Sequence, residues 1–526
     1  MNQNNISAAE LFLRVRELLI LPELEPKTRN KMMHDTLILC CHEGVKETKQ
    51  AFGNLFSQVD YLCKAHGIKV ADKIAIQTMR RHSNSQEPLS SEDLKYDARA
   101  LAIFISAVFG VDVPHELNVL IPHTNRPYQK GLEINNRRIR CIVKNWDSDF
   151  IRVDIDQDAD EEEYLVQLKD EENHIDHTYL WDILKEGMQL NLLDCQVKQP
   201  VITPRLIVVE PDYLVDISSI ATCFTAFGHH PLLYLLNQMK PRANTQATLL
   251  GNFAGAALDD IINTNGKYQM NETIKTNFRE KALEFCTCPW FDAKKFYTDA
   301  NQQAFNLQQV VDILFPRTAS QAQMSAFRGE SLYDRKKAIL EPSFVCEALG
   351  IQGRVDLMTT DCKLLVEQKS GRNMNIETHQ VDPGYHSYQL EPHYVQLLLY
   401  YGVLQHNFKL SNDRVNIRLL YSKYQPQDGL MVVAYYHKLF QEAITYRNQL
   451  VAASFEIAKE GFEHALNEFT PDVLNVAGTQ DFFYNKYLKP QIEAITSPLH
   501  NLSPIEEAYF CRMMTFVLRE QMISKV

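Results

Sequence analysis

The periodicity of hydrophobic and polar residues changes along this chain, and these changes divide it into four parts. Residues 119–218 show short stretches of strand-like alternation, residues 219–465 mix strand and helix patterns, and residues 1–118 and 466–526 are helical. Three segments of the first part have the clearest helical spacing: Leu11–Ile20, Lys31–Phe56 and Lys95–Val111. The pattern predicts a multi-domain α/β protein with a helical domain, a β domain, an α/β domain and a helical tail.

The second part, residues 119–218, predicts a small β-barrel. Five segments alternate apolar with polar residues: 138–143, 150–155, 163–168, 189–195 and 205–210. A helix-like segment, Tyr179–Lys185, separates the third from the fourth. Five strands with a helix in that place match an OB-fold barrel. Such barrels bind single-stranded nucleic acid in many proteins and act as spacers in others, and both alternatives stay open here.

The third part, residues 219–465, contains strands and a buried helix. Val415–Tyr421 and Gly429–Tyr436 predict strands, and a helix through Leu439–Val451 follows them. Upstream, the run from 393 to 404 is nearly continuously apolar, which suits a buried helix. Gln396 and Tyr400 lie four residues apart and share one face of it. A glutamine inside such a helix must find a hydrogen-bond partner.

The segment Gly353–Gly371 predicts a β-hairpin with ionisable residues where a buried strand is normally apolar. Glu367 and Lys369 are two residues apart on its second strand, so they point to the same side. The hairpin brings Asp356, on its first strand, close to Glu367. Two carboxylates and a lysine at one place make a site for a hard divalent cation. The alternative is an ion pair on a solvated face of the sheet.

These motifs resemble those of a known family. Gly-Arg-Val-Asp, then Val-Glu-Gln-Lys-Ser-Gly, then Gln-Leu-Leu-Leu-Tyr resembles the PD-(D/E)XK nucleases of the RecB type. Closest among them are the replication nuclease-helicases that trim flaps and process DNA ends. The resemblance implies an α/β core with a mixed sheet, Asp356 and Glu367 as metal ligands, and Lys369 as the catalytic cation. It also implies that Gln396 and Tyr400 support the site and the DNA backbone.

The resemblance covers about residues 219–455. Ile220–Leu236 resembles the opening helix of the family, and Leu250–Ile262 resembles the helix whose G-x-x-H motif brings a histidine to the metal. The helix that contains Arg447 and Asn448 resembles one that follows the Q-x-x-x-Y motif. An OB-like barrel before the nuclease core is also a feature of this family.

The chain departs from the G-x-x-H motif, because Asp259 stands four residues after Gly255. An aspartate serves a hard cation as well as a histidine does, so Asp259 is a candidate third metal ligand. The alternative is that Asp259 and its neighbour Asp260 lie on a solvated face. Glu341 and Glu347, in the segment entering the hairpin, are weaker candidates.

Two cofactors known in the family are not expected here. Several members hold an iron–sulfur cluster with one cysteine before the nuclease core and three after it. Cys223 lies where the first would be, but after Tyr400 the sequence contains only Cys511, and a cluster needs four ligands. We therefore expect no iron–sulfur cluster and a buried, apolar role for Cys223. Because no G-x-x-x-x-G-K-[ST] motif occurs, we expect no ATP site in this chain and a helicase module only as a partner.

Charge and composition bear on the partners. The net formal charge is −12, but residues 151–175 alone contribute −8, and nucleic-acid binding depends on a local basic track. The basic candidates that flank the site are Lys275, Arg279, Lys281, Lys294, Lys295, Arg317, Arg328, Arg335, Lys336 and Lys337. Eleven cysteines without repeated metal spacing suit a reducing cytoplasm. No apolar run reaches the roughly 20 residues of a membrane helix.

The sequence therefore predicts a Mg²⁺- or Mn²⁺-dependent nuclease that acts on single-stranded or flapped DNA in replication or repair. The alternative is a non-catalytic nucleic-acid-binding or scaffold subunit of a DNA-processing or defence complex. The acidic net charge and Asp259 in place of a histidine motivate that alternative. The residues do not separate DNA from RNA as the substrate.

Overall fold

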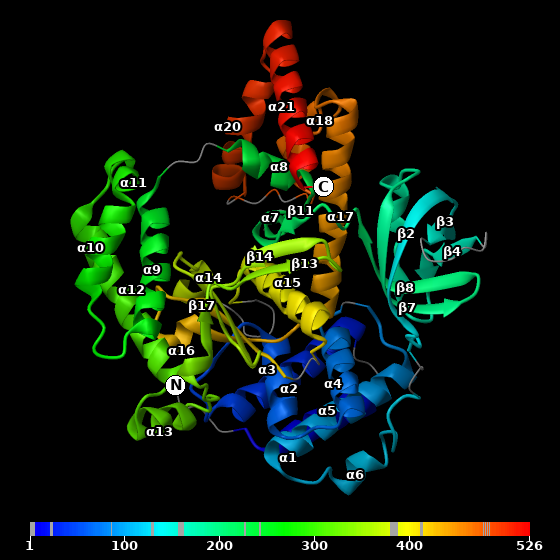
Figure 1. Ribbon diagram of the computed structural model, residues 1–526. Coiled ribbons are helices and arrows are strands. Elements are labelled where there is room, and N and C mark those ends of the chain that lie inside the picture. The colour runs from blue at the N-terminus through cyan, green and yellow to red at the C-terminus, as the bar shows by residue number, and fades with distance from the viewer. Residues whose placement is uncertain are drawn as a thin grey trace.

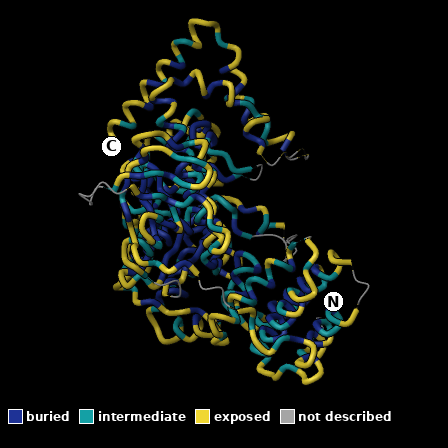
Figure 2. Tube along the Cα trace, turned by 90° about the vertical axis from the view of Figure 1, so that its right-hand side faces the viewer, coloured by how far each residue is buried: buried dark blue, intermediate teal, exposed yellow. Residues whose placement is uncertain are grey.

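The computed structural model describes residues 6–21, 25–85, 87–127, 131–155, 163–225, 228–240, 244–378, 388–410, 414–476, 478, 480, 482 and 484–525. It is a multi-domain α/β structure with a helical N-terminal part, a closed β-barrel, a mixed sheet and a helical C-terminal segment (Figure 1). Buried residues concentrate in the middle of the molecule (Figure 2). None of the helices in these ranges combines the length and apolar character needed to span a membrane.

A six-stranded mixed sheet forms the centre. Its strands, in spatial order, are β1 (Ala51–Phe52), β18 (Leu430–Val433), β17 (Asn416–Tyr421), β16 (Leu364–Lys369), β15 (Leu357–Thr359) and β12 (Ala338–Leu340). β16 runs parallel to β17 and antiparallel to β15, and β1 runs parallel to β18. The predicted strands at 415–421 and 429–436 are confirmed as β17 and β18.

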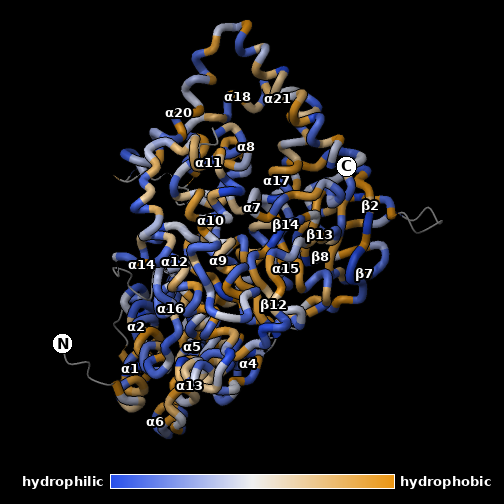
Figure 3. The backbone as a smooth tube through the Cα atoms, turned by 60° about the vertical axis from the view of Figure 1, so that its left-hand side comes forward, coloured by the Kyte–Doolittle hydropathy of each residue, from blue (hydrophilic) through white to orange (hydrophobic). Residues whose placement is uncertain are grey.

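Helices cover both faces of this sheet: α9 (Gln246–Asn263), α12 (Ala293–Leu314), α15 (Glu391–Phe408) and α17 (His437–Glu460). Leu364 and Val366 pack into the hydrophobic cluster of α9 and α12, whereas Leu365 packs into the cluster of α15 and α17. β16 is therefore buried on both faces, as the continuous apolar run before Glu367 requires. The hydrophobic positions around α15 and the neighbouring strands are visible as orange segments in Figure 3.

Shorter helices complete the core. They are α10 (Met270–Glu280), α11 (Ala282–Thr287), α13 (Ala319–Phe327), α14 (Met374–Thr378) and α16 (Pro426–Gly429). A three-stranded sheet of β13 (Ser343–Cys346), β14 (Ile351–Arg354) and β9 (Val215–Asp216) lies beside the central sheet. The first arm of the predicted hairpin is split between the two sheets, because β14 ends at Arg354 and β15 begins at Leu357. Asp356 therefore lies at the bend between two strands, and its predicted place on a strand is wrong.

The N-terminal helical part consists of α1 (Ala8–Ile20), α2 (Pro26–Val45), α3 (Leu55–Ala65), α4 (Val70–Ser83), α5 (Ser91–Phe109) and α6 (His115–Asn118). α1 and α5 confirm two of the predicted helices. The third, Lys31–Phe56, is wrong in its second half, because α2 ends at Val45 and β1 follows. β1 pairs with β18, so the N-terminal part supplies an edge strand to the central sheet.

The five predicted barrel strands are confirmed. The barrel closes in the order β2 (Asn136–Trp146), β3 (Phe150–Ile155), β4 (Tyr164–Gln167), β8 (Val201–Val209) and β7 (Gln189–Lys198). The helix-like segment is a short 3₁₀-helix, Thr178–Asp182, and a small pair, β5 (Lys169–Asp170) and β6 (Ile175–Asp176), precedes it. Most of the acidic run between β3 and β4, residues 156–162, lies outside the described ranges.

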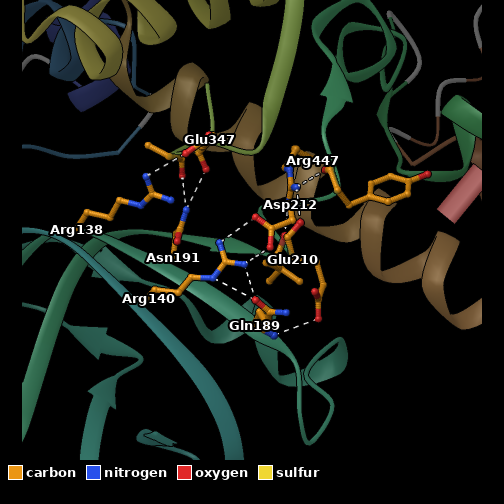
Figure 4. Close-up of polar contacts among 11 residues, drawn as sticks. Arg138, Arg140, Gln189, Asn191, Glu210, Asp212, Glu347 and Arg447 are labelled. Carbon is orange, nitrogen blue, oxygen red and sulfur yellow. Dashed lines mark hydrogen bonds and ion pairs between the residues drawn. The ribbon is translucent and has the colours of Figure 1, made fainter. Parts of the chain in front are cut away.

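Arg447 and Asn448 of α17 join the barrel to the core, and Figure 4 shows the contacts around Arg447. The Arg447 guanidinium donates to the carbonyls of Val209, Glu210, Tyr213 and Gly350. Asn448 accepts from the Val209 N–H at 3.0 Å and donates to the Ile207 carbonyl at 2.8 Å.

Two further contacts lie at the same interface. Arg140 of the barrel pairs with Asp212, and Asn191 donates to the Glu347 carbonyl at 3.0 Å (Figure 4). Polar contacts therefore hold the barrel on the core at three places: from α17 to the end of β8, from β2 to Asp212 and from β7 to Glu347.

The predicted opening helix, Ile220–Leu236, is interrupted. The structure has α7 (Ile217–Ala221), a hairpin of β10 (Phe224–Thr225) and β11 (Gly228–His229), and α8 (Leu232–Met239). The C-terminal segment contains α18 (Glu463–Leu466), α19 (Pro471–Leu474), α20 (Lys489–Leu499) and α21 (Pro504–Lys525), with a π-helical turn at Tyr484–Leu488.

Candidate active site

Four of the predicted site residues converge at the end of β16. Glu367 and Lys369 point from β16 towards α15, on the opposite side from Val366. Lys369 Nζ donates to Glu367 Oε1 at 2.8 Å and to Gln396 Oε1 at 2.7 Å. Lys369 of β16 is thus the hydrogen-bond partner that the glutamine of the buried helix requires, and Gln396 fixes the position of the ammonium group.

Asp356 reaches the same place from the bend between β14 and β15. Its Oδ2 accepts the backbone N–H of Gln368 at 2.6 Å, which ties the bend to β16. Burial is the main cause that raises the pKa of Asp356, and the charge of Glu341 adds to it. The bend therefore lets the Asp356 carboxylate bond to the backbone of β16, whereas the side chains of a regular strand stand perpendicular to the sheet.

Glu367 is the most unusual group in the site. Only 3% of the residue is exposed, and its Oε2 atom has no hydrogen-bond partner among the described residues. Burial, followed by the nearby charge of Asp356, raises the pKa of Glu367 to about 8. A buried carboxylate oxygen without a donor is unfavourable. A cation beside Oε2 would remove both the missing interaction and the repulsion from Asp356.

Asp259 also faces this site. It is half-buried on α9, and its pKa is raised to about 6 by burial and then by the charges of Glu341, Asp260 and Asp356. Asp260 turns the other way and accepts a hydrogen bond from Thr273. The sequence left open whether Asp259 and Asp260 lie near the metal site or on a solvated face. Asp259 lies near the carboxylates of the site, whereas Asp260 lies outside it.

The two weaker candidates, Glu341 and Glu347, lie at different places in the structure. The Glu341 N–H donates to the Asp356 carbonyl at 3.0 Å, and the Glu341 carboxylate pairs with Arg354 at 3.1 Å. Glu341 is therefore a fourth acidic residue of this site. Glu347 lies at the barrel, where it is 3.9 Å from Arg138, and it does not belong to the site.

The donor set fits Mg²⁺ or Mn²⁺ held by few protein ligands. Within the described part of the chain, no three histidine, cysteine, aspartate or glutamate side chains gather closely enough to hold a metal ion. Mg²⁺ is commonly bound through one or two carboxylates and substrate phosphates, and it keeps several waters. Asp356 and Glu367 supply the two carboxylates, and the unpartnered Oε2 of Glu367 is the observation that fits a cation. Asp259 is near enough to act electrostatically.

Tyr400 supports the bend and does not reach into the site through its hydroxyl. The residue is 4% exposed, and its hydroxyl donates to the Arg354 carbonyl at 2.6 Å. Its ring lies against Gly353, where a Cβ atom would come within 2.9 Å of it. The glycine therefore allows Tyr400 to approach the end of β14 and hold the chain just before Asp356.

Sequence reasoning missed His393, which lies one helical turn before Gln396. Its Nδ1 atom is 3.1 Å from the Tyr421 hydroxyl, and burial together with the charge of Lys369 lowers the pKa of His393 to about 4. A neutral imidazole therefore stands beside the lysine. The i, i+3 spacing of His393 and Gln396 on one helix face was the signal that could have identified it.

Cys223 is buried in the core, as expected from the sequence, and burial raises its pKa to about 12. All eleven cysteines are free thiols. Comparison with known protein families found no family model that matches this chain, and comparison with curated proteins found no match.

Proposed function

We propose that this protein is a divalent-cation-dependent nuclease that hydrolyses phosphodiester bonds in DNA, with Asp356, Glu367 and Lys369 at the reacting centre. The buried Glu367 carboxylate carries the proposal, because its free Oε2 atom lies beside a second carboxylate and a lysine. A structural ion pair needs neither the second carboxylate nor an oxygen left without a donor. The resemblance to PD-(D/E)XK nucleases supports the same function.

Each residue of the site would have its own role in the reaction. Asp356 and Glu367 would hold Mg²⁺ or Mn²⁺, which supplies a water of lowered pKa and offsets charge on the phosphate. Lys369 has two of its three donors on Glu367 and Gln396. The third is available to a phosphate oxygen, where it stabilises the negative charge of the transition state. Gln396 and Tyr400 act as positioning residues, and the Asp259 carboxylate adds negative potential that strengthens cation binding.

Other features of the molecule support a substrate class and a cellular location. The five-stranded closed barrel has the strand number and order of an OB-fold, which supports single-stranded or flapped DNA as the substrate. Free thiols throughout the chain support a reducing, cytoplasmic location. A helicase module is the partner proposed from the resemblance.

The test is cleavage of end-labelled single-stranded, double-stranded and flapped DNA, and of RNA, with Mg²⁺, Mn²⁺ or EDTA. Glu367→Ala and Lys369→Ala should each lower the cleavage rate by at least about 100-fold, the effect of removing a group that acts in the transition state. DNA binding measured in EDTA should change little, because the Glu367 side chain is 4% exposed and the Lys369 side chain 22%, so together they present little surface to DNA.

Lys363→Ala is the matched control, since Lys363 lies in the turn of the same hairpin and its side chain is 67% exposed. It should keep the wild-type rate. Undiminished metal-dependent cleavage by both active-site variants would refute the assignment of the site. DNA binding without cleavage on any substrate would favour the non-catalytic scaffold instead.

A further inference from the structure

A cavity lies between the barrel and the core, apart from the carboxylates of the candidate active site. Its volume is about 570 Å³, within the range of sites for small ligands. β2, β7 and β8 form one wall, and the end of α15 and the start of α17 form the other. Gln396 and His406 are ten residues apart on α15, so this cavity is roughly 15 Å along the helix from the candidate active site.

Basic side chains outnumber acidic ones in the lining of this cavity. The six are Arg137, Arg138, Arg205, His406, Lys409 and His437. Asp194 is the one carboxylate among the described residues that line it. The four permanent cations and this carboxylate give a net formal charge of +3, in a chain whose total is −12. Such a concentration of one sign in an acidic protein indicates an anionic ligand.

These cations are only partly neutralised by the protein. Arg137 pairs with Asp194 at 2.7 Å, but Arg138 is 3.9 Å from a Glu347 carboxylate that is 77% exposed. Arg205 donates to a backbone carbonyl at 3.5 Å, which is a long hydrogen bond. Lys409 forms no ion pair with a described residue. The cavity thus leaves positive charge for a ligand to neutralise.

The backbone at this place is unusual but adds no net charge to the cavity. Lys409 and Asp194 have φ angles of 54° and 49°, a region that non-glycine residues seldom adopt. α17 begins here without a side-chain cap and without an acidic residue in its first turn. Its positive end faces the negative end of α15, and the two offset each other, so the side chains decide the sign of the potential.

The imidazoles and aromatic rings define the ligand further. Burial lowers the pKa of His406 and His437, and Arg137 and Arg205 respectively add to the effect, whereas Asp194 opposes it for both. A bound anion would favour the protonated forms. Tyr435 lies beside the basic groups, with its ring centroid 6.1 Å from that of His437 and 5.8 Å from that of Phe440. Phe440 is only 2% exposed and packs behind Tyr435, so the half-buried Tyr435 ring is the aromatic surface offered to a base.

We propose that this cavity binds a nucleoside phosphomonoester, either as a free nucleotide or as the phosphorylated end of a strand. An arginine guanidinium donates two parallel hydrogen bonds to phosphate oxygens. The side of the cavity that contains Tyr435 accommodates the base. The ligand would contact barrel and core together, because the arginines come from the barrel and His406, Lys409 and His437 come from the core. This proposal does not depend on the nuclease function.

The experiment is calorimetric titration of the chain of residues 1–526 in EDTA. The probes are adenosine monophosphate, adenosine, and one short DNA strand with either a 5′-phosphate or a 5′-hydroxyl. The phosphorylated probes should bind and the unphosphorylated ones should bind at least tenfold more weakly. Tighter binding of the free nucleotide than of the phosphorylated strand, or the reverse, identifies the source of the phosphomonoester.

The test variant is Arg205→Gln with Lys409→Gln, two exposed side chains whose loss should leave the fold intact. It should weaken binding of the phosphorylated probes at least tenfold. Lys486→Gln with Lys489→Gln removes the same charge from the distant C-terminal helices and should leave binding unchanged (Figure 1). Absence of binding by the wild-type protein, equal binding of unphosphorylated probes, or equal losses in both variants would overturn the proposal.

Discussion

At the scale of single residues, Glu367 connects stability to function. Its burial and the charge of Asp356 disfavour the ionised carboxyl, so the pKa of Glu367 rises from 4.5 to about 8. Metal-free protein therefore carries a group that opposes folding whenever it is ionised. Bound cation would reverse this effect, because it interacts favourably with the charged form.

This linkage gives a pH prediction for the metal-free protein. Between pH 4.5 and about 8 the folded state holds a proton on Glu367 that the unfolded state has released. The resulting stabilisation is complete at low pH and is lost as the pH rises through about 8. In EDTA, the Tm of the wild type should fall from pH 5 to pH 8.5 by at least about 1 °C more than that of Glu367→Gln, because roughly 1 kcal/mol shifts the Tm of a chain of 526 residues by about 1 °C.

The measurement is thermal unfolding in EDTA at the two pH values, and saturating Mn²⁺ is the control condition. In Mn²⁺ the wild-type deficit at pH 8.5 should disappear, because the cation stabilises the ionised carboxyl. Identical pH dependence for wild type and Glu367→Gln would show that the carboxyl is not perturbed.

How far the site could be predicted depends on the spacing of its residues. The period of two on β16 and the four-residue spacing on α15 brought Glu367, Lys369 and Gln396 to one point, as expected. Glu341 lies at the bend between β12 and β13, which belong to different sheets. No periodic pattern of residues extends across such a bend. The direction of Asp259 depends on how α9 packs against β16, which its own sequence does not determine.

At the scale of elements, the Arg447–Asn448 pair of α17 determines how the barrel sits on the core. Arg447 is fully buried, and its guanidinium lies against Gly350, where a Cβ atom would be 2.4 Å from Nη2. Asn448 accepts a hydrogen bond from the Val209 N–H and donates one to the Ile207 carbonyl, near the end of β8. The sequence showed only a resemblance in this helix, because these bonds join segments more than 200 residues apart.

Asn448→Ala should therefore loosen the barrel. It leaves a buried N–H and a buried carbonyl without partners, which should lower stability by about 2–4 kcal/mol. Hydrogen exchange should accelerate at Val209 and along β8, and less in β16. Gln449→Ala, the next residue on the same helix, is the control and should leave exchange in β8 unchanged. Unaltered protection of the Val209 amide in Asn448→Ala would contradict this role.

The elements that sequence reasoning placed wrongly share a cause. The segments at 31–56 and 220–236 have helical spacing, yet the chain forms two-residue strands at 51–52, 224–225 and 228–229. Strands of this length carry too few residues for alternation to be visible. They form because a partner strand is present, β18 in one case and an adjacent arm in the other.

At the scale of the whole molecule, the pattern of residues changes near residue 118, but contacts join the parts on either side of this point. β1 pairs with β18, and the Gly53 N–H donates to the Val432 carbonyl at 3.0 Å. Ser57 accepts the Ala434 N–H at 3.1 Å, and Phe56 packs against Tyr436. The N-terminal helices therefore cover an edge of the sheet that contains the candidate active site.

A fragment of residues 119–526 should accordingly fold poorly. Removing β1 leaves β18 as an open edge and exposes the apolar surface beside it, and such edges pair with other molecules. The fragment should elute largely as aggregates in size-exclusion chromatography, and its soluble fraction should unfold at a lower temperature than the full chain. Supplying residues 1–118 as a separate chain should restore part of the monomer, because the missing strand is then available. A monomeric fragment with the Tm and cleavage rate of the full chain would instead show that the two parts are independent.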